Sequence, residues 1–233
     1  RDSAYLKKKF PEKNFDYHSY RNANIQDFMV SCDYLTEKGY KVVRIGNVVE
    51  KSLTTNNPNI IDYSSCKFVS DFLDIFLIHE CKFMISTSTG IDEVASIFRK
   101  PMVMVNFAPI GTLEFKPIKN FVIFKKYFCY KKNRDLSLSE IFETKSAFYQ
   151  RTENFEQNKI GLINNSSEDI LLTTKDCVKF VENQKVIYDK NIQNKFWNIY
   201  LSNRDKYNKD FYNGELNIII NDSFLKKNKH ILN

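Results

Sequence analysis

The sequence predicts an α/β fold with a parallel sheet and a helical C-terminal tail. In the first half, segments with helical spacing alternate with short apolar runs that show no polar alternation. Such runs are typical of parallel strands that helices cover on both faces. Hydrophobic residues make up 42% of the 233 residues, which is enough for a packed core. We therefore expect a Rossmann-like domain over residues 1–165 and a helical tail that packs on it over residues 166–233.

The elements of the first half follow from their spacing and caps. A helix is expected over residues 24–38, because Asn24 can cap it, Gly39 can end it and apolar residues recur every three or four positions. The next helix begins after Ser70 and is apolar almost all round, which predicts burial. A short helix follows Gly90. Parallel strands of one sheet are expected at about residues 41–45, 60–63, 83–86 and 102–106.

The second half is less regular. The apolar run at residues 121–124 predicts a buried strand, and residues 160–163 are expected to form the last strand. Ser137 and Ser166 are each followed three residues later by an acidic residue, a capping-box pattern that opens a helix. A further helix is expected at about residues 191–200.

A run of hydroxyl residues is the strongest candidate for a binding site. It joins a predicted strand to a predicted helix and comprises Ser86, Thr87, Ser88, Thr89 and Gly90. Ligands bind at the carboxyl ends of strands in open parallel sheets, and a helix N-terminus there suits a diphosphate. Asp92 and Glu93 would oppose an anion, so we expect them to meet ribose or sugar hydroxyls. The alternative is a simple helix cap made by Thr89 and Asp92.

Polar residues also end the first two predicted strands. Arg44 and Gly46 end the first strand, where an arginine can neutralise a leaving diphosphate. The alternative for Arg44 is a surface ion pair. Asp62 ends the second strand and can contact the base or the ribose.

Several of these motifs together resemble a known family. They lie at residues 1–6, 16–22, 39–46, 61–63, 70–74 and 86–90. This set resembles a bacterial family of GT-B-type glycosyltransferases associated with surface-carbohydrate synthesis. The likeness runs from residue 1 to about residue 109 and thins to short matches at residues 166–170, 195–197 and 224–228. It implies the donor-binding half of a GT-B fold, with a nucleotide-sugar as substrate, no cofactor and no metal.

Arg1 and Asp2 carry a more distant resemblance. In related sugar-nucleotide enzymes, which include protein O-fucosyltransferases, a strand ends in an arginine followed by an acidic residue, and this arginine holds the donor phosphate. Arg1 resembles that arginine and is a candidate donor-binding residue. The preceding strand is missing from the sequence. The chain also opens without a Met or a signal peptide, so we expect a processed product or a fragment.

The resemblance also implies that a polar cluster before the first long helix faces the donor or the acceptor. The cluster contains Asp16, His18, Arg21 and Asn22. His18 or Asp16 can deprotonate an acceptor hydroxyl, since an imidazole pKa near ~6.5 suits this task at neutral pH. We expect Arg21 and Asn22 to bind the donor. The alternative is a helix-capping loop.

The net charge of +7 is concentrated in one segment, Lys116–Arg134, with seven Lys or Arg, no acid and five interleaved aromatic residues. Three interpretations remain open. The segment can be a solvated face beside a buried strand, or it can contact an anionic membrane surface or an acidic acceptor. Nucleic-acid binding is not expected, because no nucleic-acid motif accompanies the charge.

Cysteine and histidine usage bears on compartment and metals. The five cysteines are scattered without a C-x-x-C pair, which predicts buried free thiols in a reducing compartment. The three histidines lie far apart, which argues against a zinc site. No run reaches the ~18 apolar residues of a membrane span. We expect a cytoplasmic protein, with peripheral contact to the inner membrane face where the basic segment docks.

The sequence therefore predicts a glycosyltransferase. It would move a sugar from a nucleotide-sugar to a glycan or lipid-linked acceptor in surface-polysaccharide synthesis. The alternative is a non-catalytic nucleotide- or sugar-binding module, or a truncated remnant of the enzyme. A polyanion-binding protein that uses the basic segment is a further alternative.

Overall fold

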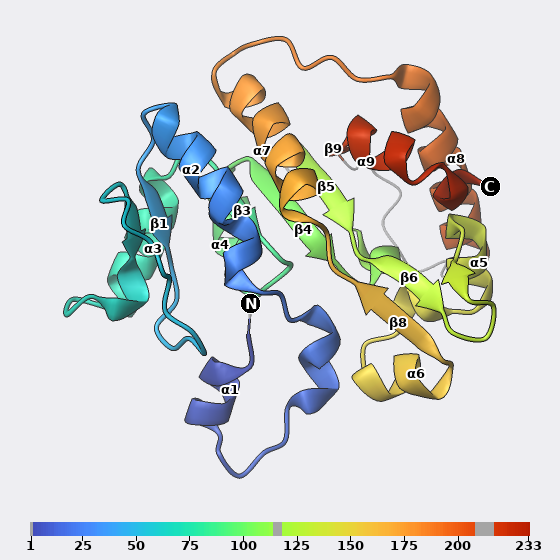
Figure 1. Ribbon diagram of the computed structural model, residues 1–233, viewed down its shortest axis with the longest axis horizontal. Helices are drawn as coiled ribbons and strands as arrows, with labels where there is room; N and C mark the ends of the chain where they lie inside the picture. The colour runs from blue at the N-terminus through green and yellow to red at the C-terminus, as the bar shows by residue number, and fades with distance from the viewer. Residues whose placement is uncertain (1, 114–117, 208–216) are drawn as a thin grey trace.

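A parallel four-stranded sheet, sheet B, forms the centre of the computed structural model, which describes residues 2–113, 118–207 and 217–233 (Figure 1). Its strand order is β3-β4-β5-β9, with every neighbouring pair parallel. The strands are β3 (Met84–Ser86), β4 (Met102–Phe107), β5 (Asn120–Phe124) and β9 (Ile218–Ile220). All residues of β4 and β5 are buried, as expected for strands covered on both faces. The predicted α/β class with a parallel sheet is confirmed.

The first two predicted strands form, but they belong to a separate sheet. Sheet A consists of β1 (Val42–Arg44) and β2 (Ile60–Asp62), paired in parallel. The prediction of one sheet for all four strands was therefore wrong, because no ladder joins sheet A to sheet B within the described residues. Ile60, together with the partly buried Val42, still packs into the same hydrophobic core as β4 and β5.

A third sheet, sheet C, was not predicted. It is antiparallel and contains β6 (Lys126–Cys129), β7 (Arg134–Asp135) and β8 (Ile160–Ile163) in the order β7-β6-β8. The expected strand at residues 160–163 exists. It is neither parallel nor last in the chain, because β8 pairs with β6 and β9 follows it.

The C-terminal segment is more than a helical tail. It contains α7 (Ser167–Val181), α8 (Lys190–Tyr207), α9 (Asp222–Lys227) and the short helix η6 (Lys229–Leu232). Between α8 and α9, β9 enters sheet B beside β5. A boundary at residue 165 thus does not separate the sheet from purely helical structure, since the last strand of the sheet comes from residues 218–220.

The N-terminal helices begin where their caps predict. After α1 (Ala4–Lys9) and η1 (Asp16–Arg21), the helix expected at residues 24–38 starts as η2 (Ile25–Phe28) and continues as α2 (Met29–Glu37). The Asn24 side chain accepts a hydrogen bond from the N–H of Gln26 and so caps η2. In Figure 1, α2 and α7 lie side by side in front of the sheets, and α2 contacts α7 and both strands of sheet A.

The remaining helices are η3 (Tyr63–Ser65), α3 (Asp71–Glu80), α4 (Asp92–Ile97), η4 (Ile110–Thr112), α5 (Leu138–Glu143), η5 (Ser146–Phe148) and α6 (Thr152–Gln157). Both predicted capping boxes are present, at the starts of α5 and α7. No helix among the described residues is both long and apolar enough to span a bilayer. All five cysteines are free thiols, but only Cys32, Cys129 and Cys177 are buried as predicted, whereas Cys66 and Cys81 are partly buried.

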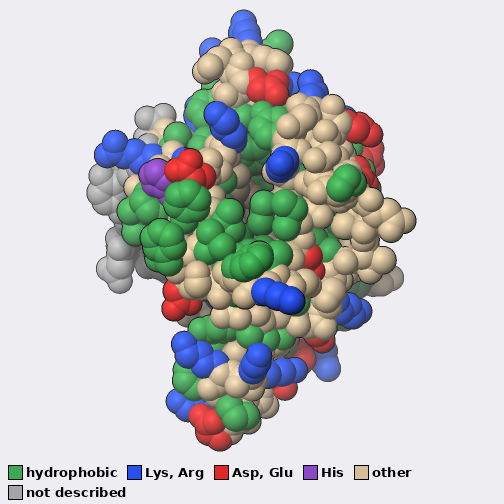
Figure 2. Space-filling model, turned by 90° about the vertical axis from the view of Figure 1, so that its left-hand side faces the viewer, with side chains coloured by type: hydrophobic (Ala, Val, Ile, Leu, Met, Phe, Trp, Pro, Cys, Tyr) green, Lys and Arg blue, Asp and Glu red, His purple; other side chains and the backbone are tan. Residues whose placement is uncertain are grey.

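Helix α3 is exposed where burial was expected. Only Ile78 of this helix is buried, and Phe72 is 76% exposed. The helix lies at the left edge of the molecule in Figure 1 and packs mainly on α4, so one side meets the protein and the other meets solvent. Figure 2 shows that face, with hydrophobic side chains gathered across its middle. Phe72 and Phe76 are stacked on it with ring centroids 6.2 Å apart.

Candidate functional site

The predicted hydroxyl run forms the turn between β3 and α4. Ser86 and Thr87 are buried, and the carboxylate of Asp92, only 1% exposed, fills the turn from inside. Asp92 accepts hydrogen bonds from the Ser86 hydroxyl at 2.5 Å, the Thr89 hydroxyl at 2.9 Å and the Thr89 N–H at 2.7 Å. The hydroxyls of Ser86 and Thr89 are thus used to close the turn. The alternative, a capping box made by Thr89 and Asp92, does not form, because the N-cap residue of α4 is Ile91 and no side-chain hydrogen bond caps this helix among the described residues.

The outer part of the turn faces the polar cluster of η1. Ser88 has a left-handed backbone with φ 60°, and its carbonyl accepts a hydrogen bond from the Arg21 guanidinium. Gly90 and Glu93 are exposed, and a Cβ at Gly90 would meet no atom within 4 Å. Two segments 67 residues apart in the chain therefore meet at the carboxyl end of β3, as the site prediction requires.

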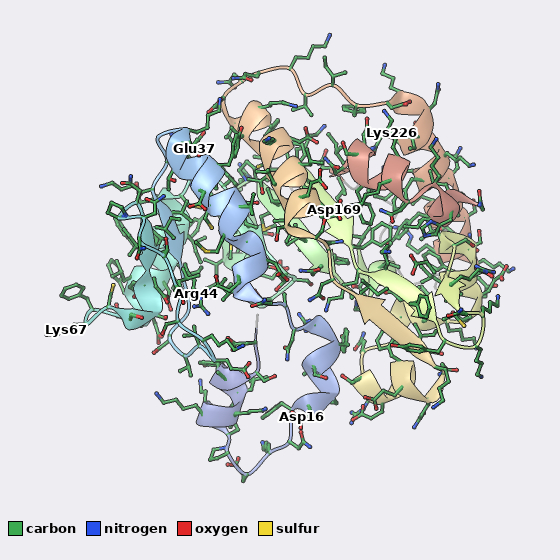
Figure 3. All side chains as sticks on the ribbon, in the orientation of Figure 1. Asp16, Glu37, Arg44, Lys67, Asp169 and Lys226 are labelled. Carbon is green, nitrogen blue, oxygen red and sulfur yellow. The ribbon has the colours of Figure 1, made fainter. Side chains whose placement is uncertain are left out.

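Arg44 lies at the end of β1, where it is predicted, but its charge is offset (Figure 3). The guanidinium is 11% exposed and lies 3.4 Å from an Asp62 carboxylate oxygen and 4.0 Å from one of Asp2. It also donates to the carbonyl of Lys51 at 2.6 Å. Asp62 accepts in addition from the Leu53 N–H at 2.7 Å. Arg44 and Asp62 thus fasten the loop that begins at Gly46, where φ is +134°.

Residues 2 and 3 connect these groups. Asp2 contacts Arg44, and the Ser3 hydroxyl accepts a hydrogen bond from the Asn22 amide at 2.9 Å. Arg21, next to Asn22, reaches the turn after β3. The structure therefore brings most predicted donor-binding residues into one polar network at the carboxyl ends of β1 and β3. Arg1 lies outside the described residues.

The two candidate catalytic residues lie at the other end of η1. Asp16 is exposed, and its carboxylate lies 3.7 Å from the Lys7 ammonium (Figure 3). His18 packs between aromatic rings, 4.1 Å from Tyr17 and 6.4 Å from Tyr20 by ring centroids. Neither lines the two cavities described below. Their role as general bases stays a prediction.

Sequence reasoning missed the most unusual ionisable group of this region, Lys125. It follows β5 directly, is 3% exposed, and donates to the carbonyls of Tyr20 at 2.7 Å and Asn22 at 2.8 Å. Burial lowers the pKa of Lys125 to about 8 from its ordinary value. Lys125 directly follows four apolar residues of β5, at 121–124, and this position indicated a buried lysine. The segment was instead interpreted as a basic face.

A cavity of about 280 Å³ opens beside Lys125, between η1, α6 and β8. Its polar walls include Asn22, Thr152 and Glu156, and its apolar walls include Tyr20 and Phe155. The Thr152 hydroxyl also anchors η1, since it donates to the Tyr17 carbonyl at 3.1 Å and accepts from the Tyr20 N–H at 3.1 Å.

The rest of the basic segment is largely paired with carboxylates. Lys126 lies 2.9 Å from Asp135, and Lys132 and Arg134 lie 2.6 and 2.7 Å from Glu140. The Arg134 hydrogen bonds, followed by that from Lys132, hold the pKa of Glu140 well below its usual range. Lys116 lies outside the described residues, and Lys131 is exposed.

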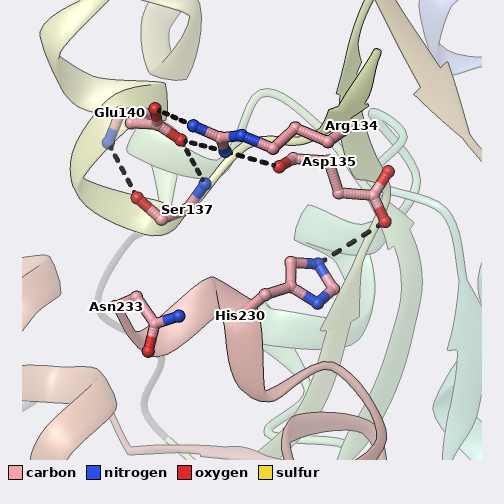
Figure 4. A pocket seen from close by; sticks show the side chains of 6 residues that line it. All are labelled: Arg134, Asp135, Ser137, Glu140, His230 and Asn233. Carbon is pink, nitrogen blue, oxygen red and sulfur yellow. Dashed lines mark hydrogen bonds and ion pairs between the residues drawn. The ribbon is translucent and has the colours of Figure 1, made fainter. Parts of the chain in front are cut away.

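A larger, open cavity of about 620 Å³ lies at the other end of sheet C (Figure 4). The residues that line it are Arg134, Asp135, Ser137, Glu140, His230 and Asn233. Its charged groups pair with one another, with His230 3.5 Å from Asp135 and Arg134 bonded to Glu140. It contains none of the predicted site residues.

Across the described ranges, no group of three or more His, Cys, Asp or Glu side chains could hold a metal ion. Comparisons with models of known protein families, with curated proteins and with solved structures find no match for the chain.

Proposed function

We propose that the chain binds a nucleotide-sugar and serves as the donor-binding part of a GT-B-type glycosyltransferase of surface-carbohydrate synthesis. Two lines support the proposal. The sequence motifs of residues 1–109 resemble that family. In the fold, the motifs at residues 2–3, 21–22, 44–46 and 86–90 form one polar network at the carboxyl ends of parallel strands, where open α/β sheets bind ligands.

The contact between Arg21 and Ser88 is the observation that carries the proposal. It places a guanidinium against the turn after β3, and the Nε of Arg21 is buried without a hydrogen-bond partner in the described part of the chain. Guanidinium groups bind phosphate oxygens through several parallel donors. Arg44, by contrast, already has two carboxylate partners. Arg21 is therefore the cation that we assign to the donor diphosphate.

In the proposed reaction, an acceptor hydroxyl attacks the anomeric carbon of the donor sugar. The bond from that carbon to the diphosphate oxygen breaks, and the nucleoside diphosphate leaves with the bonding electron pair. A positively charged side chain beside the leaving oxygen lowers the barrier, because negative charge develops there in the transition state. His18 or Asp16 would take the proton of the acceptor hydroxyl.

Replacement of Arg21 tests the proposal directly. Arg21→Ala should weaken binding of nucleoside diphosphates about tenfold or more, since one charge-assisted contact of ~1.5–3 kcal/mol is lost. Isothermal titration with several nucleoside diphosphates measures the change. Arg99→Ala is the matched control, because Arg99 is exposed and follows the C-terminal end of α4, away from the turn after β3. Equal affinity of both variants and the unmodified protein would contradict the assignment.

A measurement of turnover distinguishes an enzyme from a non-catalytic binding module. A glycosyltransferase should release nucleoside diphosphate from at least one nucleotide-sugar, and Arg21→Ala should lower that rate at saturating donor. Tight binding of a nucleotide-sugar without release of diphosphate, in the presence of glycan and lipid-linked acceptors, would support the non-catalytic module instead.

A further inference from the structure

The side chain of Lys125 is buried, and no ion pair compensates its charge in the described part of the chain. Its ammonium has three N–H donors, and the described contacts use two of them, to the carbonyls of Tyr20 and Asn22. Burial lowers the pKa of Lys125, and no ion pair with this ammonium is found among the described residues. Buried charges in proteins are normally paired, because an unpaired one costs several kcal/mol. An anion next to Lys125 would relieve that cost.

Lys125 also borders an open volume. Lys125 lines the cavity of about 280 Å³ between η1, α6 and β8. Asn22 lines the same cavity, and its side-chain oxygen is buried without a hydrogen-bond partner among the described residues. Two residues that each keep an unused donor or acceptor among the described contacts, Lys125 and Asn22, therefore line the same cavity. A ligand with an anionic group and a hydroxyl satisfies both.

The size and the lining of the cavity further restrict the class of ligand that can bind. Its volume is at the lower end of the ~300–1,000 Å³ typical of small-molecule sites, which fits one sugar ring better than a nucleotide. The rings of Tyr20 and Phe155, with centroids 5.4 Å apart, give it an apolar wall. Thr152 and Glu156 add polar groups on another side.

We propose that this cavity binds a single sugar unit that carries an anionic group, either a carboxylate or a phosphate, with Lys125 as its cationic partner. The Asn22 side-chain oxygen accepts a hydroxyl of the same sugar. Because the donor diphosphate is assigned to Arg21, this sugar unit belongs to the acceptor, an assignment that rests on the proposed function. Binding itself requires only the cavity.

Titration calorimetry with glucuronate, glucose 1-phosphate and glucose tests the site. At least one of the two acidic sugars should bind tenfold or more tightly than glucose, and the tighter of the two identifies the anionic group. Lys125→Met should abolish this preference. Lys126→Met is the matched control and should retain it, because Lys126 pairs with Asp135 outside the cavity. Equal binding of glucose and both acidic sugars would overturn the proposal.

Two further measurements do not depend on the folding of the Lys125 variant. Glu156→Gln removes an exposed carboxylate from the cavity wall and should strengthen binding of the acidic sugar about twofold or more at low salt. Binding to the unmodified protein at pH 8.5 should also take up protons, since an anion favours the ammonium form of Lys125. Absence of both effects would contradict an anion beside Lys125. No nucleotide is present, so these results are independent of the Arg21 test.

Discussion

The polar side chains at the carboxyl ends of the strands fall into two groups according to their partners. Asp92 and Arg44 are fully engaged in closing a turn and a loop. Arg21, Asn22 and Lys125 each keep one polar atom or donor without a partner among the described residues. The sequence shows residue types but not these partners, and those of Arg21 and Lys125 come from segments 67 and 105 residues away. This is why Arg44 was the stronger candidate in the sequence and Arg21 is the stronger one in the structure.

The lowered pKa of Lys125 predicts an unusual pH dependence of stability. In the folded protein this ammonium titrates at about 8, whereas an unfolded lysine titrates near 10.5. Between these pH values the unfolded chain binds more protons, so the free energy of unfolding rises with pH relative to a variant without the lysine. The pKa difference corresponds to a gain of roughly 2–3 kcal/mol between pH 7.5 and 10.5.

Urea unfolding of the unmodified protein and of Lys125→Met at several pH values measures this gain. The difference between the two proteins cancels the contributions of thiols and phenols that titrate in the same range. A difference that stays constant from pH 7.5 to 10.5 would show that Lys125 is not buried as a cation.

At the scale of elements, consecutive apolar residues predicted strands reliably, whereas segments that mix apolar and charged residues were misinterpreted. The strands β1 to β5 were predicted because each contains at least two consecutive apolar residues, and each contributes to the core. β6 was read as part of a basic face, although its buried Tyr127 and Cys129 alternate with partly exposed Lys126 and Phe128, the period of an antiparallel strand. β9 was overlooked, although three consecutive isoleucines between asparagines mark it.

Pairing of strands was harder to predict than their existence. Whether two parallel pairs join into one sheet depends on backbone register and spacing, which the pattern of side chains does not encode. The apolar circumference of α3 was likewise read as burial. In the structure that helix lies at the edge of the molecule, because little of the described chain is available to cover its outer side.

The turn between β3 and α4 should depend on one carboxylate. Asp92→Ala leaves the hydroxyls of Ser86 and Thr89 and one N–H without their acceptor, so it should lower the free energy of unfolding by roughly 2–3 kcal/mol. Glu93→Ala, at the exposed neighbouring position of the same helix, should change it by about 0.5 kcal/mol or less. Chemical denaturation measures both, and similar losses for the two variants would contradict the role of Asp92.

For the whole molecule, two phenylalanines illustrate the difference between the buried core and the exposed face of α3. Phe124 is fully buried in β5 and contacts Phe196 of α8 and Phe224 of α9, with ring centroids 5.9 and 5.1 Å apart. It therefore joins the middle of the chain to its C-terminal part. Phe72 on α3 is mostly exposed.

Replacement of each by alanine should reveal this difference. Phe124→Ala should cost roughly 3–5 kcal/mol of unfolding free energy, as for large-to-small changes in a packed core. Phe72→Ala should change it by about 0.5 kcal/mol or less. Thermal or urea unfolding of the two variants measures the costs. A loss above about 1 kcal/mol for Phe72→Ala would mean that α3 is covered in solution.

The position of β9 also has a consequence for biosynthesis. Its partner β5 is complete at residue 124, whereas β9 begins at residue 218. Sheet B therefore cannot be completed until nearly a hundred further residues have been synthesised. At ~5–20 residues per second of translation, this delay lasts roughly 5–20 s. During that time the nascent chain presents an unpaired, apolar strand edge to other chains and to chaperones. Correct folding in the cell thus depends on how well the edge of β5 is shielded until translation is complete.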